Sequence, residues 1–198
     1  MATGLAFTID KNSVGAVTVR QSGRVLGTAF VFIKPEWVVT AKHVVFEQGS
    51  WRENLGLLFV DGGVDAHGIY ADPNIDLAVL QIDGALCQHP LFPAHQAFAS
   101  QSGLITLGYR PTLSKEPGRT TIEANQVSSF ESERRDRSAG PEEIIRFDAP
   151  FSEGGHSGGP VLGTGGGVIG VVIENLKEGE RLIARATSIA PIVARLTF

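Results

Sequence analysis

The sequence is poor in cysteine and in charge. Its one cysteine, Cys87, excludes an intrachain disulfide and indicates a reducing compartment or a protein that does without such bridges. Charged residues make up 19% of the chain against 42% hydrophobic residues, which argues against intrinsic disorder. The formal net charge of −4 lacks the basic excess of nucleic-acid-binding proteins. We therefore expect a folded chain with no nucleic-acid partner.

Long apolar runs are also missing, and no stretch approaches the roughly 18 apolar residues of a membrane span. A signal peptide has a basic start followed by an apolar run, and the segment from Met1 to Lys11 lacks this pattern. We therefore expect no membrane partner and a cytoplasmic location. No His or Cys pair has a recurring metal-ligand spacing, so neither a metal nor another cofactor is expected.

Turn residues, in contrast, are abundant, with 24 glycines and 10 prolines. Between them lie short runs rich in Val, Ile, Thr and Phe, each about as long as a strand. The runs are residues 14–20, 25–33, 37–41, 55–60, 77–82, 104–109, 120–130, 144–147, 168–173 and 182–187. Closely spaced strands of this kind predict an all-β sandwich or barrel. Only residues 44–47 and 189–196 have a helical pattern.

The segment 83–102 is poor in strand pattern and divides the chain into two β-rich halves. We predict domains at residues 1–90 and 91–198. Glycines at 163–167 predict a hairpin turn, because glycine tolerates the positive φ that such turns require. Residues 128–143 are highly charged and are interpreted as a long surface loop.

A serine flanked by glycines lies in Gly-Gly-His-Ser-Gly-Gly-Pro, residues 154–160. The tight backbone path exposes the Ser157 hydroxyl and lets neighbouring amides point at one spot. An oxyanion hole needs this geometry, and the amides of Gly155 and Ser157 would be its donors. A plain glycine-rich turn is the alternative interpretation.

Two further residues complete a candidate constellation. His43 ends a β-like run, and an imidazole is the natural base for a hydroxyl near neutral pH. Asp76 heads the apolar run 77–82, where a carboxylate is costly unless it is paired. Orienting a histidine would supply that pairing. The alternatives are a structural histidine and a turn aspartate such as Asp65, Asp72 or Asp83.

The order His, Asp, Ser along the chain differs from the orders of subtilisin and of α/β-hydrolases. Four segments carry a family resemblance: Gly-Thr-Ala-Phe-Val-Phe (27–32), Trp-Val-Val-Thr-Ala-Lys-His (37–43), Ile-Asp-Leu-Ala-Val-Leu (75–80) and Gly-His-Ser-Gly-Gly-Pro-Val-Leu (155–162). They resemble the marker segments of trypsin-like serine peptidases. The closest likeness is to the disulfide-free bacterial branch that includes HtrA/Deg proteins. The resemblance covers about residues 14–192.

The resemblance implies two six-stranded antiparallel β-barrels with the active site between them, followed by a short C-terminal helix. His43 and Asp76 would come from the first barrel, and Ser157 from the second. It implies a serine endopeptidase that cleaves polypeptides through an acyl-enzyme. The module would belong to a larger or regulated bacterial system, with a regulatory partner or appended domains.

The sequence departs from the family pattern in places. His156 stands where digestive members have Asp and the HtrA branch usually has Asn, so we predict no activation by N-terminal cleavage. Phe151 stands where trypsin carries its specificity Asp, which favours a small or aliphatic P1 residue, although Glu153 or Glu174 could attract a basic one. The predicted pocket walls are Phe151, Ser152, Glu153, Gly154, Ile173, Glu174 and Asn175. Gating by the charged segment 128–143 is a further hypothesis.

Two other functions fit the same residues. A catalytically silent binding module on this fold would keep the triad but lack a formed oxyanion loop. An esterase or another acyl transferase would share the chemistry and differ in substrate.

Overall fold

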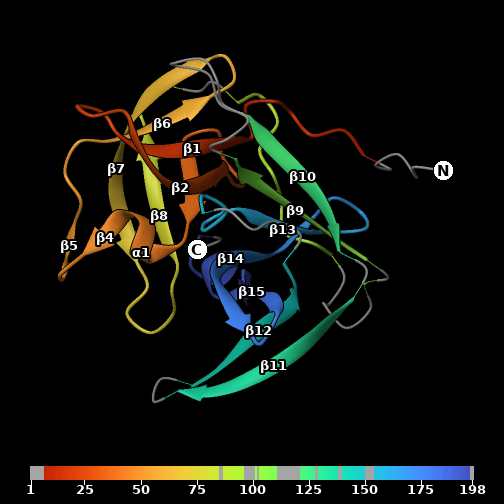
Figure 1. Ribbon diagram of the computed structural model, residues 1–198. Helices are drawn as coiled ribbons and strands as arrows, with labels where there is room; N and C mark the ends of the chain where they lie inside the picture. The colour runs from red at the N-terminus through yellow and green to blue at the C-terminus, as the bar shows by residue number, and fades with distance from the viewer. Residues whose placement is uncertain are drawn as a thin grey trace.

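The computed structural model describes residues 7–84, 87–95, 101, 103–110, 121–127, 129–137, 140–149 and 154–196. Within these ranges the chain is built from antiparallel strands and two short helices (Figure 1). In chain order they are β1 (Val14–Val19), β2 (Arg24–Val31), β3 (Trp37–Thr40), α1 (Lys42–Val45), β4 (Phe46–Glu47), β5 (Ser50–Trp51), β6 (Leu55–Phe59), β7 (Gly62–Ala71), β8 (Ala78–Ile82), β9 (Leu104–Tyr109), β10 (Ile122–Val127), β11 (Phe130–Arg137), β12 (Gly140–Asp148), β13 (Pro160–Gly163), β14 (Val168–Glu178), β15 (Arg181–Ser188) and α2 (Ala190–Leu196).

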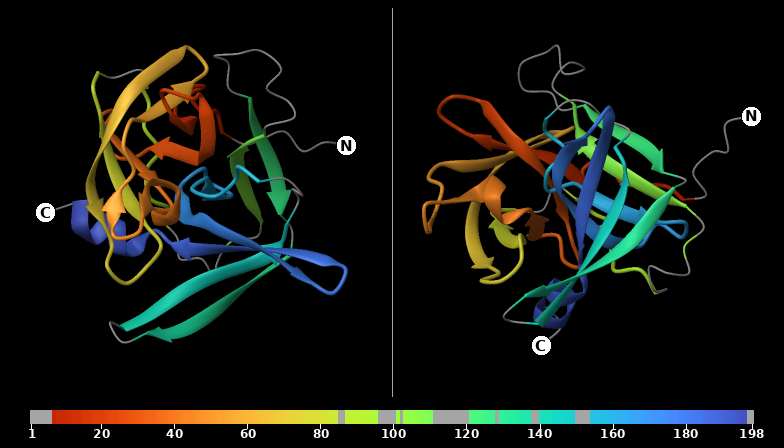
Figure 2. Two further views of the ribbon diagram at one scale, coloured as in Figure 1. Left: turned by 60° about the vertical axis from the view of Figure 1, so that its left-hand side comes forward. Right: turned by 60° about the horizontal axis from the view of Figure 1, so that its bottom comes forward.

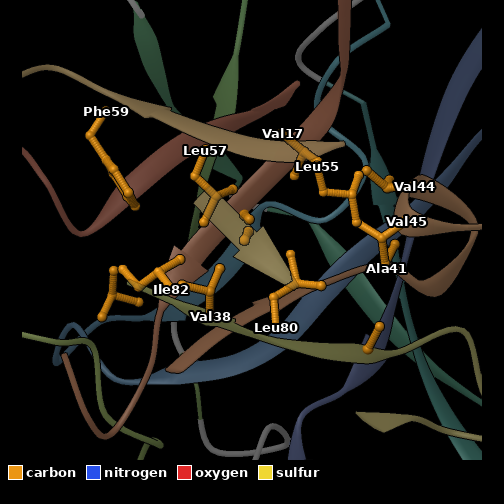
Figure 3. Packing of buried hydrophobic residues seen from close by; sticks show 14 of the residues in the cluster. Val17, Val38, Ala41, Val44, Val45, Leu55, Leu57, Phe59, Leu80 and Ile82 are labelled. Atoms are coloured by element: carbon orange, nitrogen blue, oxygen red, sulfur yellow. The ribbon is translucent and has the colours of Figure 1, made fainter. Parts of the chain in front are cut away.

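The first half forms a closed barrel with the strand order β1-β2-β3-β8-β7-β6. Its interior is filled by aliphatic and aromatic side chains from all of these strands (Figure 3). Members of this first core cluster include Val17, Val38, Leu57, Phe59 and Leu80. Closure leaves no unpaired strand edge in the barrel, which gives the loops at its ends a rigid base.

Strands β3 and β8 are buried on both faces because they lie where the two halves meet. Val38 and Leu80 point into the barrel, whereas Val39 and Val79 belong to a second core cluster. That second cluster also contains Leu107 and other residues of the second half. A strand that is buried on both faces needs apolar residues at every position, which explains the unbroken apolar run at 77–80.

The second half forms a seven-stranded sheet with the order β10-β9-β13-β14-β15-β12-β11. One face carries a third core cluster with Leu104, Ile145, Phe147 and Val172 among its members. The predicted all-β, chymotrypsin-like fold is confirmed. Among the described residues a closed six-stranded barrel is seen in the first half, whereas the second half is a seven-stranded sheet whose edge strand β11 pairs with β12. The division into domains 1–90 and 91–198 stays a prediction.

The prediction of a charged loop at 128–143 is wrong. Most of this segment is the hairpin of β11 and β12, which extends along one side of the molecule in Figure 2. Oppositely charged side chains stabilise the hairpin and its neighbours. Arg146 on β12 lies 3.4 Å from Glu131 on β11 and also pairs with Glu178 on β14. Charge compensation between strands therefore replaces the apolar alternation that usually marks a strand.

Two smaller features match expectation. The C-terminal helix is present as α2, and Ile192 packs its apolar face into the second core cluster. The glycines at 163–167 form the β13–β14 turn, where Gly166 has a φ of 81°. No helix in the described ranges is both long and apolar enough to span a membrane.

Candidate active site

His43 lies at the point where β3 passes into helix α1. The strand ends at Thr40, whose buried hydroxyl donates to the Thr28 carbonyl oxygen on β2 at 2.7 Å. The chain then turns at Ala41, and His43 follows in the first turn of α1 with about half of its side chain exposed. The end of a buried strand thus presents the imidazole to solvent from a fixed backbone.

Asp76 lies in the loop between β7 and β8, and Asp72 shapes that loop. The Asp72 carboxylate accepts the backbone N–H groups of Asn74 at 2.9 Å and Ile75 at 3.1 Å, and the Tyr70 hydroxyl at 2.9 Å. The Lys42 ammonium donates to the Asp72 carbonyl oxygen at 2.5 Å. These bonds close the loop around a buried aspartate and place Asp76 against the start of α1.

The side chains of His43 and Asp76 are joined directly. His43 Nδ1 lies 2.6 Å from Asp76 Oδ2, and the His43 backbone N–H donates to Oδ1 at 2.9 Å. Both carboxylate oxygens are therefore used by the same residue. The bond at Nδ1 leaves Nε2 as the ring atom that can accept a proton from a nucleophile.

The pKa of Asp76 lies below its ordinary value of 3.8, and this shift is the net result of two opposing effects. Burial alone raises the pKa, since it disfavours the charged form. The hydrogen bond from the His43 side chain, the His43 charge, the His43 backbone N–H and the Lys42 charge outweigh this effect. Asp76 is thus an anion at neutral pH, as a partner of a protonated imidazole must be.

Ser157 lies in a tight loop before β13. Gly155 and Gly158 have φ angles of 110° and 89°, which side chains rarely tolerate. The Gly158 N–H donates to the Val172 carbonyl oxygen at 2.7 Å. The Val172 N–H donates to the Gly159 carbonyl oxygen at 2.9 Å. The glycine-rich segment that contains Ser157 is therefore a loop held against β14.

The same loop is docked onto the first barrel. The Thr28 N–H donates to the Ser157 carbonyl oxygen at 2.8 Å. A Cβ added at Gly158 would lie 2.0 Å from the Thr28 carbonyl oxygen and 2.2 Å from the Thr40 hydroxyl. A Cβ added at Gly27 would meet both the Ser157 carbonyl oxygen at 2.7 Å and a Val44 methyl at 2.9 Å. Ser157 therefore lies beside the helix that carries His43.

The structure brings all three triad candidates to one place, but it joins only two of them. Among the described residues, the Ser157 hydroxyl makes no hydrogen bond within 3.5 Å, either to His43 or to another group. Catalytic hydrogen bonds are often long in proteins without substrate and tighten when substrate binds. The catalytic roles of His43, Asp76 and Ser157 and the oxyanion roles of Gly155 and Ser157 stay predictions.

The predicted pocket walls fall into three groups. Phe151, Ser152 and Glu153 lie outside the described residues. Gly154 and Asn175 are exposed, whereas Ile173 is buried against the first core cluster. The Glu174 carboxylate accepts a hydrogen bond from Arg185 at 3.1 Å and lies 3.8 Å from Arg135. Two guanidinium groups therefore compensate the charge of Glu174.

His156, which precedes Ser157, is only 1% exposed. Its ring packs flat on Gly108, where an added Cβ would lie 2.2 Å from the ring. Its Nε2 atom lies 3.9 Å from Glu123 on β10, and Glu123 also accepts a hydrogen bond from Arg110 at 2.6 Å. The sequence marks His156 as unusual but does not reveal Glu123 or Gly108 as its neighbours.

Two residues at the site were not singled out as functional by the sequence. Thr28 is fully buried and binds the Ser157 loop, and Asp72 organises the loop that carries Asp76. Thr28 lies within a segment that resembles the family markers, which is the one signal for it. Asp72 was interpreted as a turn aspartate, and its hydrogen bonds to the backbone of Asn74 and Ile75 agree with this interpretation.

A separate cavity of about 610 Å³ lies away from these residues. The N-terminal segment around Phe7, the segment around Phe92 and the glycine-rich β13–β14 turn line it. None of the triad candidates contributes to its walls.

Paired β-rich halves, with a His–Asp pair on one and a glycine-flanked serine on the other, define a chymotrypsin-like serine peptidase fold. The trypsin-like peptidase domain family matches residues 27–171. The chain therefore belongs to the trypsin-like peptidase domain family, and its relatives include HtrA/DegP-like serine proteases.

Known proteins show the extent of the likeness. The chain is 31% identical over 149 residues to a "Probable periplasmic serine endoprotease DegP-like" of Brucella suis. The aligned region covers 73% of this chain and 26% of that protein. The chain thus spans about a quarter of the length of the curated relatives it matches. The active form of the Rv3671c protease from M. tuberculosis superposes with a TM-score of 0.70 at 22% identity, over 95% of this chain and 81% of that one. The HtrA-type protease AlgW superposes with a TM-score of 0.67 at 20% identity, over 95% of this chain and 60% of that one.

Proposed function

We propose that this chain is a serine endopeptidase that cleaves polypeptides with the triad Ser157, His43 and Asp76. The observation that carries the proposal is the doubly bonded His43–Asp76 pair, beside which Thr28 anchors the Ser157 loop. Family membership supports a peptidase over the other functions considered.

The proposed mechanism follows from these positions. Ser157 Oγ attacks the scissile carbonyl carbon while His43 Nε2 takes the hydroxyl proton. Asp76 holds the ring by Nδ1 and stabilises the imidazolium that forms. The amides of Gly155 and Ser157 donate to the developing oxyanion. His43 then protonates the leaving amine, and water hydrolyses the acyl-enzyme by the same route.

A catalytically silent binding module is the second candidate, and one observation favours it. Among the described residues, the Ser157 hydroxyl is not hydrogen-bonded to His43. Such a module would bind a polypeptide without attacking it.

A fluorophosphonate probe distinguishes the two candidates, because it reacts with activated serines only. Labelling of the wild type that is lost in Ser157→Ala supports the peptidase. The exposed Ser22→Ala provides the matched control and should label like the wild type. A wild-type protein that stays unlabelled, yet binds peptides, would establish the silent module.

Substrate choice forms a further part of the proposal. We expect a small or aliphatic P1 residue, since Phe151 replaces a specificity aspartate and Glu174 is compensated by Arg185. A peptide-library digest with the wild type and Ser157→Ala side by side tests this, and cleavage after Arg or Lys would refute it. Cleavage of simple esters but of no peptide would indicate an esterase instead.

The cellular setting is also proposed. The single buried cysteine fits a cytoplasmic location, whereas the Brucella relatives are named periplasmic. Cell fractionation of the source organism decides between the two compartments. The additional length of the relatives leaves room for appended domains or a regulatory partner in this system too.

A further inference from the structure

Thr28 on β2 binds both residues whose amides are the proposed oxyanion donors. Its backbone N–H donates to the Ser157 carbonyl oxygen at 2.8 Å. Its hydroxyl donates to the Gly155 carbonyl oxygen at 2.5 Å. Thr28 itself is fully buried, which shields its side of both bonds from water. A residue of the first barrel therefore holds the nucleophile loop of the second half at two points.

The direction of the hydroxyl bond follows from a third contact. The Tyr109 backbone N–H donates to Thr28 Oγ1 at 2.8 Å. A threonine hydroxyl has one proton, and an amide nitrogen can only donate. The Thr28 proton is therefore directed at Gly155, and the hydroxyl connects β9 to the loop. Figure 1 shows β9 beside β2, where this bridge is made.

Gly155 has the wide backbone freedom of a glycine. Its φ of 110° lies in a region that glycine visits freely, and it follows another glycine. A Cβ added at Gly154 would meet no atom within 4 Å, so the space beside this glycine is open. The bond from Thr28 fixes the orientation of the Gly155 carbonyl group. That carbonyl shares a planar peptide group with the His156 N–H, so the bond fixes the segment that lies between the two proposed donor amides.

We propose that Thr28 is a positioning residue: its hydroxyl and backbone N–H hold the loop from Gly155 to Ser157 and thereby keep the two proposed donor amides in their oxyanion-binding orientation. This proposal rests on the proposed function and names one residue that keeps the site ready for catalysis. Thr28 itself touches no substrate, so its effect falls on transition-state stabilisation rather than on substrate binding.

Three variants test the role of the hydroxyl. Thr28→Val keeps the shape and removes the hydroxyl, so kcat on a cleaved peptide should fall by about tenfold or more with KM within about twofold. Thr28→Ser restores the hydroxyl and should recover kcat to within about threefold of the wild type. Thr106→Val is the matched control, because its buried hydroxyl on β9 has no hydrogen-bond partner among the described residues. Its kcat should match that of the wild type.

The rate of fluorophosphonate labelling at Ser157 provides a second readout, which should follow the same order. If Thr28→Val does not fold, Thr28→Cys replaces it, since a thiol of similar size is a weak donor and should also lower kcat. A Thr28 variant without the hydroxyl that keeps wild-type kcat and labelling would overturn the positioning role alone. A wild-type protein that neither cleaves nor labels would overturn the proposed function, and the positioning role with it.

Discussion

His43 and the carboxylate of Asp76 are joined by two hydrogen bonds, one from the imidazole ring at 2.6 Å and one from the His43 backbone N–H at 2.9 Å. A single residue thus occupies both oxygens of its partner. This arrangement fixes the ring orientation and explains why the pKa of Asp76 stays below its usual value in spite of burial. It also links protein stability to pH.

Replacement of Asp76 by Asn should reveal that link. Because the folded-state pKa of Asp76 lies below the ordinary value of 3.8, the ionised carboxylate stabilises the fold above pH 3.8. This contribution is lost as pH falls through the folded-state pKa. The free energy of unfolding of the wild type should therefore exceed that of Asp76→Asn near neutral pH, and the difference should shrink as the pH falls below 3.8.

Urea unfolding at several pH values provides the measurement. Asp83→Asn removes one negative charge at an exposed position and controls for net charge. A gap between wild type and Asp76→Asn that widens in acid would contradict the assigned direction of the pKa shift. At neutral pH, Asp76→Asn should also lower kcat by roughly 10⁴, as expected when the histidine is held in the wrong tautomer.

The loop that carries Asp76 depends on Asp72, and Asp72→Ala tests this dependence. The change leaves the N–H groups of Asn74 and Ile75 without their acceptor and frees the Tyr70 hydroxyl. Loss of acceptors for buried groups should cost about 1–3 kcal/mol in the free energy of unfolding. Activity should fall as well, since the displaced loop carries Asp76 away from His43.

Asp72→Asn is the conservative comparison, because its amide oxygen can still accept the two N–H groups. It should lie between the wild type and Asp72→Ala in thermal unfolding and in turnover. Equal turnover in all three proteins would show that the loop holds Asp76 without help from Asp72.

These residues show how far the sequence predicts the molecule. His43, Asp76 and Ser157 were singled out because each stands in a marker segment. In the structure, the segments that carry them lie next to one another. Thr28 was not singled out, because a threonine within an apolar run is common in buried strands and gives no sign of a function. Its partners Gly155 and Tyr109 are distant in sequence, and only the docking of the two halves brings them together.

The β11–β12 hairpin was not predicted from the sequence for a different reason. Strand periodicity is read from apolar alternation, and residues 131–137 alternate only charges and a serine. Their strand pairing depends on partners such as Arg146, which the sequence places in another segment. Cross-strand charge pairing of this kind leaves no local pattern from which a strand could be predicted.

Gly158→Ala should disrupt the junction between the two halves. The added methyl would lie 2.0 Å from the Thr28 carbonyl oxygen, and the φ of 89° is itself unfavourable for alanine. We expect a loss of about 2–4 kcal/mol in unfolding free energy, or failure to fold, from overpacking and backbone strain together. Chemical unfolding measures it.

Gly165→Ala is the matched control in the β13–β14 turn, where an added Cβ meets no atom within 4 Å. Its unfolding free energy should stay within about 0.5 kcal/mol of the wild type. Comparable stability of both alanine variants would mean that the Ser157 loop is not clamped on Thr28.

Cys87 should be chemically silent in the folded protein. Burial, with the nearby Asp10 charge adding to it, raises the pKa of its thiol to about 11. The side chain is only 1% exposed, so few thiolates form at neutral pH and reagents cannot reach them. Alkylation by iodoacetamide should therefore proceed far more slowly in native buffer than in concentrated urea. The control is Ser22→Cys in a Cys87→Ser background, whose exposed thiol should react at similar rates in both solutions. Rapid labelling of Cys87 in native buffer would contradict the prediction and would show that the chain around Cys87 opens readily.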